Sequence, residues 1–267
     1  YTSQVIIAGG EPVFVDAKEE NGFEIKAEDI ESVITKMTKV ILLNTPSNPT
    51  GAVISKRELQ KIADLAIRKD LIVISDEVYE YFVYDDAHHV SIASLDGMSD
   101  RTITVNSLSK TYSMTGFRIG YAAGSSKFVS LMTKLQESTV ACVSTISQKA
   151  ALEALQAEQG DIKKMIDEYS IRRELLFDRM LSIPRVKPNK PKGGFYAFIN
   201  IKDLDRYSEH FSIELLKSKK VCVVPGSAFG ESGEGYIRVS FSASQQNIIE
   251  GTERIKKFVE ENYGSVL

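Results

Sequence analysis

The chain has 267 residues, a length that can bury a substantial apolar core in one or two domains. Charged residues make up 26% of it and the formal net charge is -3, which argues against a nucleic-acid partner, since such a partner would require a basic surface. No apolar run approaches the ~20 residues that a membrane-spanning helix needs, so we expect no membrane partner either.

The first half of the chain alternates short apolar runs with a helical pattern. Residues 40–44, 71–75 and 102–106 are apolar runs that predict buried strands. Between the first two, Ser55 and Glu58 form a capping-box pattern, and apolar residues then recur at helical spacing. This alternation predicts parallel strands joined by right-handed crossovers, and hence an α/β layered domain.

The second half begins with a long helical pattern and then changes character after a group of prolines. The expected elements are helices around 161–181, 212–219 and 244–261 and strands at 195–199, 221–224 and 236–240. These shorter, mixed elements predict a smaller α+β unit. We place the domain boundary inside the long helix, which gives a large domain over residues 1–165 and a small domain over residues 166–267.

Polar motifs directly follow the predicted strands of the first half. The motifs are Asn-Thr-Pro-Ser-Asn-Pro-Thr-Gly at 44–51, Ser-Asp-Glu-Val-Tyr at 75–79, and the run that contains Lys110. In parallel α/β sheets, ligands collect beyond the carboxyl ends of the strands. Asn48, Asp76 and Lys110 each come just after a strand, so we expect them to converge on one edge of the sheet.

The run around Lys110 carries the strongest chemical signal. Ser107 and Ser109 frame the lysine, and Arg118 follows eight positions later. An amine in this setting can form a Schiff base with a carbonyl compound while the arginine and the hydroxyl groups hold a phosphate dianion. The pattern therefore suits covalent binding of a phosphate-bearing carbonyl compound.

Together the three motifs resemble the signature of class I/II aminotransferases, the pyridoxal-phosphate enzymes with the aspartate aminotransferase fold. The resemblance runs from Tyr1 to the C-terminus and is closest to the archaeal and bacterial branch that acts on aspartate or aromatic amino acids. It implies a cofactor-binding large domain with a mostly parallel sheet, a smaller C-terminal α+β domain, pyridoxal 5'-phosphate as cofactor, a homodimer and a cytoplasmic location.

The resemblance also implies that the N-terminal third of the family's chain is absent. In the family, that part supplies the first helices, a Gly-rich phosphate turn and the aromatic ring that stacks on the cofactor. We therefore expect residues 1–267 alone to bind the cofactor weakly and to transaminate poorly.

The resemblance assigns roles around the cofactor ring. Asp76 would keep the pyridine nitrogen protonated, so that the ring can act as an electron sink. Tyr79 and Asn48 would donate hydrogen bonds to the phenolate oxygen of the cofactor. Lys110 would carry the cofactor as a Schiff base and, once displaced by the substrate amine, would act as the general base.

Further residues match the family's phosphate and substrate contacts. Arg118 would pair bidentately with the phosphate, aided by Ser107 and by Ser109. Arg238 matches the arginine that binds the substrate α-carboxylate, and Asn48 would assist it. An arginine within an apolar strand is costly to bury without an anion, although a structural salt bridge would also satisfy it.

These matches predict an amino-acid aminotransferase that moves an amino group from aspartate or an aromatic L-amino acid to a 2-oxo acid such as 2-oxoglutarate. A pyridoxal-phosphate lyase of the same fold, an inactive fragment and a ligand-sensing module remain alternatives. The Ser-x-x-Lys spacing of Ser107 and Lys110 also occurs in penicillin-binding proteins, but the Ser-Asp-Asn and Lys-Thr-Gly motifs that should follow are missing.

The cysteines and histidines predict no metal site. Cys142 and Cys222 are far apart in apolar surroundings, so we expect buried free thiols in a reducing cytoplasm. His88 and His89 are expected in a solvated loop, and His210 on the surface of a helix.

Overall fold

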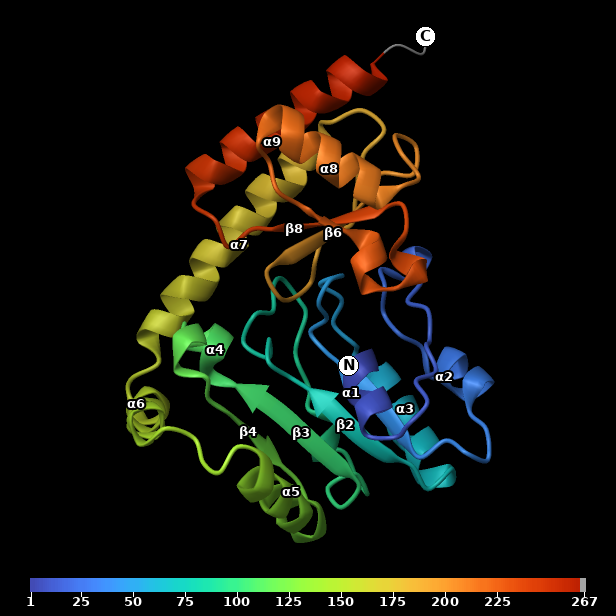
Figure 1. Cartoon of the computed structure of the whole chain (residues 1–267), viewed down its shortest axis with the longest axis vertical. Coiled ribbons are helices and arrows are strands. Elements are labelled where there is room, and N and C mark those ends of the chain that lie inside the picture. Colours follow the sequence, from blue (N-terminus) through green and yellow to red (C-terminus); the bar gives the residue numbers. More distant parts are fainter. Residues whose placement is uncertain (265–267) are drawn as a thin grey trace.

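The computed structural model describes residues 1–264 and contains two four-stranded sheets joined through a long helix, α7 (Figure 1). The helices are α1 (Thr2–Ile7), α2 (Ala27–Val33), α3 (Lys56–Arg68), α4 (Leu108–Thr111), α5 (Ser126–Thr139), α6 (Thr145–Gln156), α7 (Gly160–Leu181), α8 (Ser208–Lys219) and α9 (Gln245–Tyr263). The strands are β1 (Val40–Asn44), β2 (Ile72–Asp76), β3 (Thr102–Ser107), β4 (Gly120–Ala123), β5 (Lys187–Pro188), β6 (Tyr196–Asn200), β7 (Val224–Pro225) and β8 (Tyr236–Ser240).

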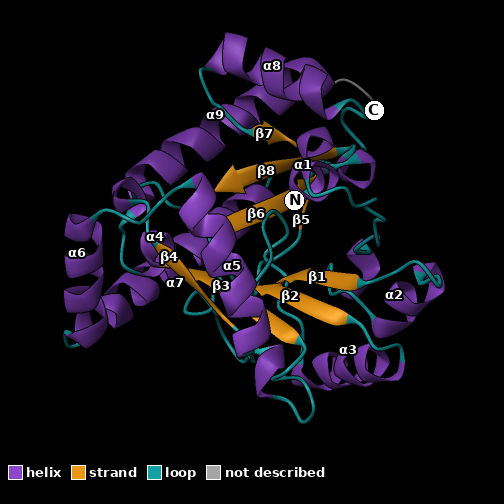
Figure 2. Ribbon diagram, turned by 60° about the horizontal axis from the view of Figure 1, so that its bottom comes forward, coloured by secondary structure: helices purple, strands orange, loops and turns teal. Residues whose placement is uncertain are grey.

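The first sheet has the strand order β1-β2-β3-β4. Its first three strands are parallel, as predicted, with Asn44 opposite Asp76 and Asp76 opposite Val105. Helix α3 covers one face of β1 and β2, where Leu43 and Val73 pack against Ile62 in one buried cluster (Figure 2). The carboxyl ends of the three strands therefore lie side by side, which is the arrangement that the polar motifs require.

The N-terminus of α3 forms half of the predicted capping box. The Ser55 hydroxyl accepts a hydrogen bond from the backbone N–H of Glu58 at 3.3 Å. The reciprocal bond is replaced, because Glu58 instead accepts from the backbone N–H of Ala27 at 2.8 Å. The backbone N–H of Ser55 is satisfied by Glu24, again at 2.8 Å. The cap thus also ties α3 to the segment that precedes β1.

Strand β4 and helices α5 and α6 were not predicted. Strand β4 runs antiparallel to β3, and all four of its residues are exposed. Helix α5 has no buried residue within the described chain. Strand β4 is only four residues long, whereas the apolar residues Phe128, Leu131, Met132 and Leu135 of α5 do recur at helical spacing, so this helix could have been predicted.

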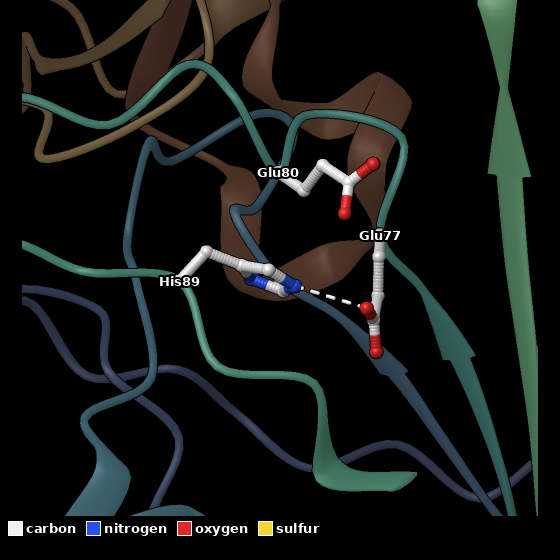
Figure 3. A group of neighbouring side chains, drawn as sticks. All are labelled: Glu77, Glu80 and His89. Atoms are coloured by element: carbon white, nitrogen blue, oxygen red, sulfur yellow. Dashed lines mark hydrogen bonds and ion pairs between the residues drawn. The ribbon is translucent and has the colours of Figure 1, made fainter. Parts of the chain in front are cut away.

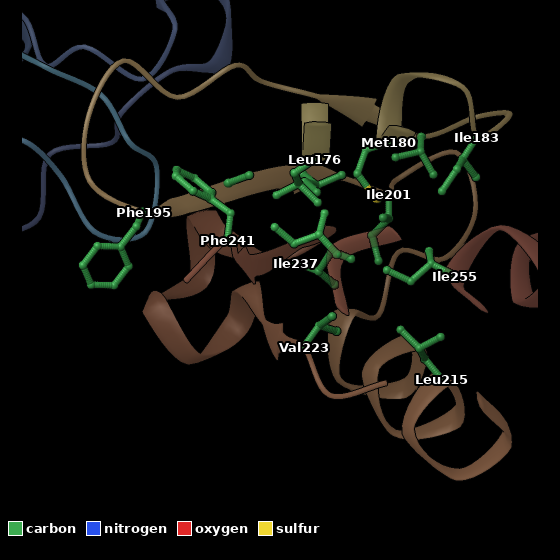
Figure 4. Close-up of a cluster of buried hydrophobic side chains, with 14 of the residues drawn as sticks. Leu176, Met180, Ile183, Phe195, Ile201, Leu215, Val223, Ile237, Phe241 and Ile255 are labelled. Atoms are coloured by element: carbon green, nitrogen blue, oxygen red, sulfur yellow. The ribbon is translucent and has the colours of Figure 1, made fainter. Parts of the chain in front are cut away.

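The second sheet has the order β5-β6-β8-β7 and is antiparallel throughout. One face of β6 and β8 presents Ala197, Ile199 and Ile237 to a core that α7, α8 and α9 complete (Figure 4). The alternate residues, which include Tyr196 and Arg238, point to the other face. That face lies toward the first sheet.

Helix α7 matches the predicted long helix, and its apolar side packs as expected. Leu176 is buried in the core of the second sheet, and Met165 and Tyr169 pack against it. Arg173 is fully buried on the same helix, where its Nη2 atom lies 2.6 Å from Asp85 and its guanidinium group 4.7 Å from the centroid of the Tyr84 ring.

Some local predictions were wrong. A strand was predicted at 221–224, but only Val224 of this run belongs to a strand. Val223 is apolar for a different reason, because its side chain packs into the core of the second sheet. Cys142 and Cys222 are both exposed free thiols, not buried ones. None of the helices within residues 1–264 is long and apolar enough to cross a membrane.

Candidate active site

The loop after β1 is bonded directly to the end of β2. The Asn44 side chain donates to the backbone carbonyl of Asp76 at 3.3 Å, and the backbone N–H of Thr45 donates to the same carbonyl at 3.1 Å. The Asn44 side-chain oxygen in turn accepts from the backbone N–H of Asn48 at 3.0 Å. Two of the three predicted motifs are therefore brought together through Asn44, a residue to which the sequence assigned no role.

Asp76 presents a half-buried carboxylate at the end of β2. Its Oδ1 atom accepts from the backbone N–H of Val78 at 3.2 Å, and its Oδ2 atom accepts from the hydroxyl group of Tyr1. Although the Tyr1 residue is 55% exposed, partial burial and the bond to Asp76 raise the pKa of its phenol above the usual range, so the phenol stays a donor. The Asp76 carboxylate can therefore accept a hydrogen bond from a group at the position of the Tyr1 hydroxyl.

Tyr79 is buried on the turn that follows Asp76. Burial raises the pKa of Tyr79, the Tyr196 side chain raises it further, and Arg238 opposes the change. The Tyr79 ring packs edge-on against the ring of Phe195 at a centroid distance of 5.3 Å. A protonated phenol is therefore held in place as a hydrogen-bond donor.

Lys110 lies on α4, the short helix that follows β3. Its Nζ atom is 5.8 Å from the centroid of the Phe195 ring, the same ring that packs on Tyr79. Ser107 is the N-cap of α4, and its side chain accepts from the backbone N–H of Ser109 at 3.1 Å. The third motif therefore meets the second at Phe195, and the second is bonded to the first through Asn44.

The chain after Arg118 folds back along β3 as β4, and the Ser107 hydroxyl donates to the carbonyl of Ile119 at 3.3 Å. Gly120 of β4 pairs with Ser107, and a Cβ atom at Gly120 would lie 2.6 Å from the carbonyl oxygen of Asn106, so only glycine fits there. Arg118 has a left-handed backbone, with φ of 52°, and donates to the carbonyl of Thr115 at 3.1 Å. Arg118 is exposed and stands two residues before Gly120. Ser109 is almost fully buried, at 9% exposure, which leaves its hydroxyl less accessible than that of Ser107.

Arg238 reaches the site from the second sheet. Its Nη1 atom donates to the side-chain oxygen of Asn48 at 2.9 Å. The guanidinium carbon lies 4.2 Å from the centroid of the Tyr196 ring and 4.9 Å from that of Phe229. No carboxylate among residues 1–264 pairs with Arg238, so the described chain does not contain the structural salt bridge that was the alternative. An organic carboxylate is the kind of ligand that such a group binds.

Close glycine contacts set the distance between the loop after β1 and the second sheet. The backbone N–H groups of Lys192 and Gly193 both donate to the carbonyl of Gly51 at 2.8 Å. A Cβ atom at Gly193 would lie 2.6 Å from Pro46 and 2.9 Å from the carbonyl oxygen of Phe82. The Gly-Gly pair that precedes Phe195 thus lets the two halves of the site approach each other.

A buried polar network supports the turn that carries Asp76 and Tyr79 (Figure 3). Glu77 accepts from Ser75 and Ser91, each at 2.8 Å, and lies 2.9 Å from the Nε2 atom of His89. The His89 side chain is only 9% exposed, so the predicted solvated loop was wrong for this residue. Glu80 lies beside this pair. The three side chains are close enough to surround a cation, but the Glu77 carboxylate is already occupied by protein donors.

The sequence did not reveal Tyr1, Tyr196, Phe195 and Phe229 as neighbours of the site. Phe195 and Tyr196 follow the Gly-Gly pair at 193–194, and Phe229 lies in the Pro-Gly-Ser-Ala-Phe-Gly run at 225–230. Tyr196 reaches Arg238 through the pairing of β6 with β8, which a single sequence does not specify, whereas Phe229 reaches it from the 3-10 turn at Gly226–Phe229.

Comparison with known proteins agrees with this geometry. The aminotransferase class I and II family matches residues 1–255. The chain is 46% identical over 265 residues to an aspartate aminotransferase of Pyrococcus abyssi and 45% identical to aromatic-amino-acid aminotransferase 2 of Thermococcus litoralis. In both cases it covers 67% of the relative's length while 98% of this chain is matched.

Solved structures give the same result. An aromatic aminotransferase from Pyrococcus horikoshii superposes with a TM-score of 0.95 at 45% identity, over 98% of this chain and 70% of that one. A double mutant of the Thermus thermophilus aspartate aminotransferase superposes with a TM-score of 0.91 at 33% identity, over 96% and 66%. The predicted fold class is confirmed, and the chain belongs to the aminotransferase class I and II family of enzymes.

Proposed function

We propose that the chain transfers an amino group from an L-amino acid to a 2-oxo acid with the aid of pyridoxal 5'-phosphate. The observation that carries this proposal is the meeting of Lys110, Asp76 and Tyr79 at the ends of parallel strands, opposite an arginine without a carboxylate partner in residues 1–264. An amine, a carboxylate and a phenol in this arrangement suit the cofactor, and Arg238 suits the α-carboxylate that amino and 2-oxo acids share.

The donor set fits the cofactor. Asp76 already accepts a hydrogen bond from the Tyr1 phenol, so a ring N–H could donate to it from a similar position. Ser107 pairs with Gly120, two residues after Arg118, and this proximity along the chain supports a shared role of Arg118 and Ser107 in holding a phosphate. Ser109 would contribute less because it is almost fully buried. When bound, pyridoxal phosphate supplies an electron sink that stabilises negative charge at the substrate Cα.

The protein residues would divide the remaining work. Lys110 would hold the cofactor covalently and, when free, accept the proton from the substrate Cα. Arg238 would bind the α-carboxylate through paired N–H groups, with Asn48 fixing one of its nitrogens at 2.9 Å. Tyr79 and Asn48 would donate to the cofactor's ring oxygen. Asp76 would stabilise the protonated ring nitrogen.

Aspartate is our first choice of amino donor and an aromatic amino acid our second, with 2-oxoglutarate as the acceptor. The support is that relatives at 46% and 45% identity are named for these two activities. A panel of amino donors would discriminate between the two, since an aspartate enzyme should favour a second carboxylate and an aromatic enzyme should favour a ring.

The assembly, location and division of the chain are part of the same proposal. We infer a homodimer, and the exposed apolar residues Leu131 and Leu135 on α5 could form part of its interface. We also infer a cytoplasmic location, because exposed free thiols such as those of Cys142 and Cys222 suit a reducing compartment. We also propose that the domain boundary falls within α7, between residues 165 and 166.

Borohydride reduction tests the assignment of Lys110. Reduction of the protein with pyridoxal phosphate should fix the cofactor to the peptide that contains Lys110, and Lys110→Ala should abolish the label. Lys164→Ala is a matched control, because its side chain is 81% exposed on α7, and it should leave the label unchanged. A label on another lysine in the unaltered protein would contradict the assignment.

A further inference from the structure

Two aromatic rings lie against the guanidinium group of Arg238. Its Cζ atom is 4.2 Å from the centroid of the Tyr196 ring and 4.9 Å from that of the Phe229 ring. An aromatic ring attracts the guanidinium charge without taking one of its N–H groups as a conventional hydrogen-bond donor. Asn48 takes one of the five N–H donors, and no other acceptor in the described chain bonds to the group. The remaining donors therefore stay available in the plane of the guanidinium.

The Tyr196 and Phe229 rings are held by different kinds of backbone structure. Tyr196 begins β6, which pairs with β8 so that Phe198 lies opposite Arg238. Residues two apart on a strand share a face, so Tyr196 lies diagonally across from Arg238 on the same side of the sheet. Phe229 instead ends the short 3-10 turn at Gly226–Phe229 and is 36% exposed. The paired strand fixes Tyr196 more firmly than the turn fixes Phe229.

Tyr196 also contacts the residues on the cofactor side of the site. Its ring meets that of Tyr79 edge-on at a centroid distance of 6.2 Å and that of Phe195 at 4.8 Å. Because Phe195 is also the ring beside Lys110, Tyr196 lies between the arginine and the groups at the strand ends.

We infer that Tyr196 is a positioning residue for carboxylate binding: its ring fixes the plane of the Arg238 guanidinium group. A guanidinium group that is already held in one plane loses little further rotational entropy when it binds the α-carboxylate of an amino or 2-oxo acid. Binding is therefore tighter than it would be to a freely rotating group. Tyr196 acts through Arg238 and does not itself contact the substrate. The inference rests on the proposed function, because that proposal makes Arg238 the carboxylate ligand.

Binding of 2-oxoglutarate to the protein loaded with pyridoxal phosphate tests this role without turnover, since the oxo acid cannot accept an amino group from that form. Tyr196→Leu removes the ring and should weaken binding about tenfold by calorimetry, with a matching rise in KM and kcat within about twofold. Tyr196→Phe keeps the ring and should bind within about twofold of the unaltered protein. Phe229→Leu should weaken binding in the same direction but less.

Controls separate this inference from the function on which it depends. Tyr263→Leu makes the same change at a half-buried tyrosine of α9 that stacks on Phe211, and it should leave binding unchanged. Arg238→Ala should nearly abolish binding; if it does not, the proposed function fails. If Arg238→Ala loses binding while Tyr196→Leu and Phe229→Leu retain it, the inference is wrong. Loss of binding in Tyr196→Phe would also overturn it, because the hydroxyl and not the ring would then be responsible. If the circular dichroism spectrum shows that Tyr196→Leu is not folded, the binding measured for Phe229→Leu and Tyr196→Phe decides whether the inference holds.

Discussion

Asp76 and Arg238 lie on different sheets and have different tasks in the proposed reaction, so their variants should fail in different ways. Asp76→Asn should lower kcat by on the order of a hundredfold with little change in KM, because a carboxylate no longer stabilises the positive ring nitrogen. Arg238→Lys should raise KM for amino and oxo acids by about tenfold or more, because an ammonium group cannot replace paired N–H donors. Steady-state kinetics checks both. Equal losses of kcat with unchanged KM in the two variants would contradict this division.

Glu80 is the residue for which the structure predicts a pH-dependent effect on stability. Burial raises the pKa of Glu80, while the Asn106 amide, 2.6 Å away, and His89 oppose the rise and Glu77 adds to it. An acid with a raised pKa in the folded state holds its proton more tightly there than in the unfolded chain. Its contribution to stability therefore falls as the pH rises from the unfolded pKa through the folded one, and stays low above it.

Glu80→Gln keeps an acceptor for Asn106 but cannot ionise. We therefore expect the variant to have a higher Tm than the unaltered protein at about pH 7, and the difference to vanish toward about pH 4. Glu153→Gln is the control, since Glu153 is exposed on α6, and it should show no such trend. A Tm difference that is independent of pH would mean that ionisation of Glu80 is not its cause.

At the scale of the elements, the contact between Gly193 and the loop after β1 allows the sharpest test. Gly193→Ala would place a Cβ atom 2.6 Å from Pro46, 2.8 Å from Val53 and 2.9 Å from the carbonyl oxygen of Phe82. We expect the free energy of unfolding in urea to fall by about 1–3 kcal/mol. Gly251→Ala makes the same change in α9, where nothing lies within 4 Å, and should stabilise by about 0.5–1 kcal/mol. Similar effects of both changes would show that the close approach is not limiting.

Elements with strong local signals were predictable. The bounds of β1 and β8 are as expected, and Ser55 caps α3, because an apolar run and a capping residue are local features. Helix α5 was missed although Phe128, Leu131, Met132 and Leu135 recur at helical spacing, and none of its residues is buried in the described chain. The boundary between residues 165 and 166 stays a proposal.

The candidate site divides in the same way. The motifs around Asn48, Asp76 and Lys110 could be placed from their positions after strands, since parallel strands share one edge. The neighbours Tyr196 and Tyr1 could not, because they meet Arg238 and Asp76 across long sequence separations. Likewise, two adjacent histidines gave no sign that His89 would turn inward to Glu77.

At the scale of the molecule, the core of the second sheet includes aromatic side chains from the segment that follows the first sheet. The apolar cluster under the second sheet includes Tyr79, Phe82 and Tyr84, which follow β2 of the first sheet. Backbone bonds also cross, since the N–H of Tyr84 donates to the carbonyl of Lys192 and the N–H of Gly194 to that of Phe82. Loss of packing in the second sheet would therefore also release the segment that follows β2.

We accordingly expect a single cooperative thermal transition for the chain, with near-ultraviolet and far-ultraviolet circular dichroism giving the same midpoint. Residues 166–267 produced alone should lack fixed tertiary packing, because their core would be missing three large aromatic side chains. Two separated transitions, or a well-packed isolated segment, would show that the shared cluster contributes little. Phe82→Leu, within the cluster, should lower the midpoint of both signals together.

The shared cluster also has a consequence during synthesis on the ribosome. Tyr79, Phe82 and Tyr84 emerge early, but their packing partners extend to Val259 near the end of the chain. At ~5–20 residues per second, these aromatic side chains wait on the order of ten seconds or longer before their partners exist. During that interval the nascent chain exposes an aggregation-prone aromatic segment to solvent. We therefore expect residues 79–84 to be a binding site for a ribosome-associated chaperone.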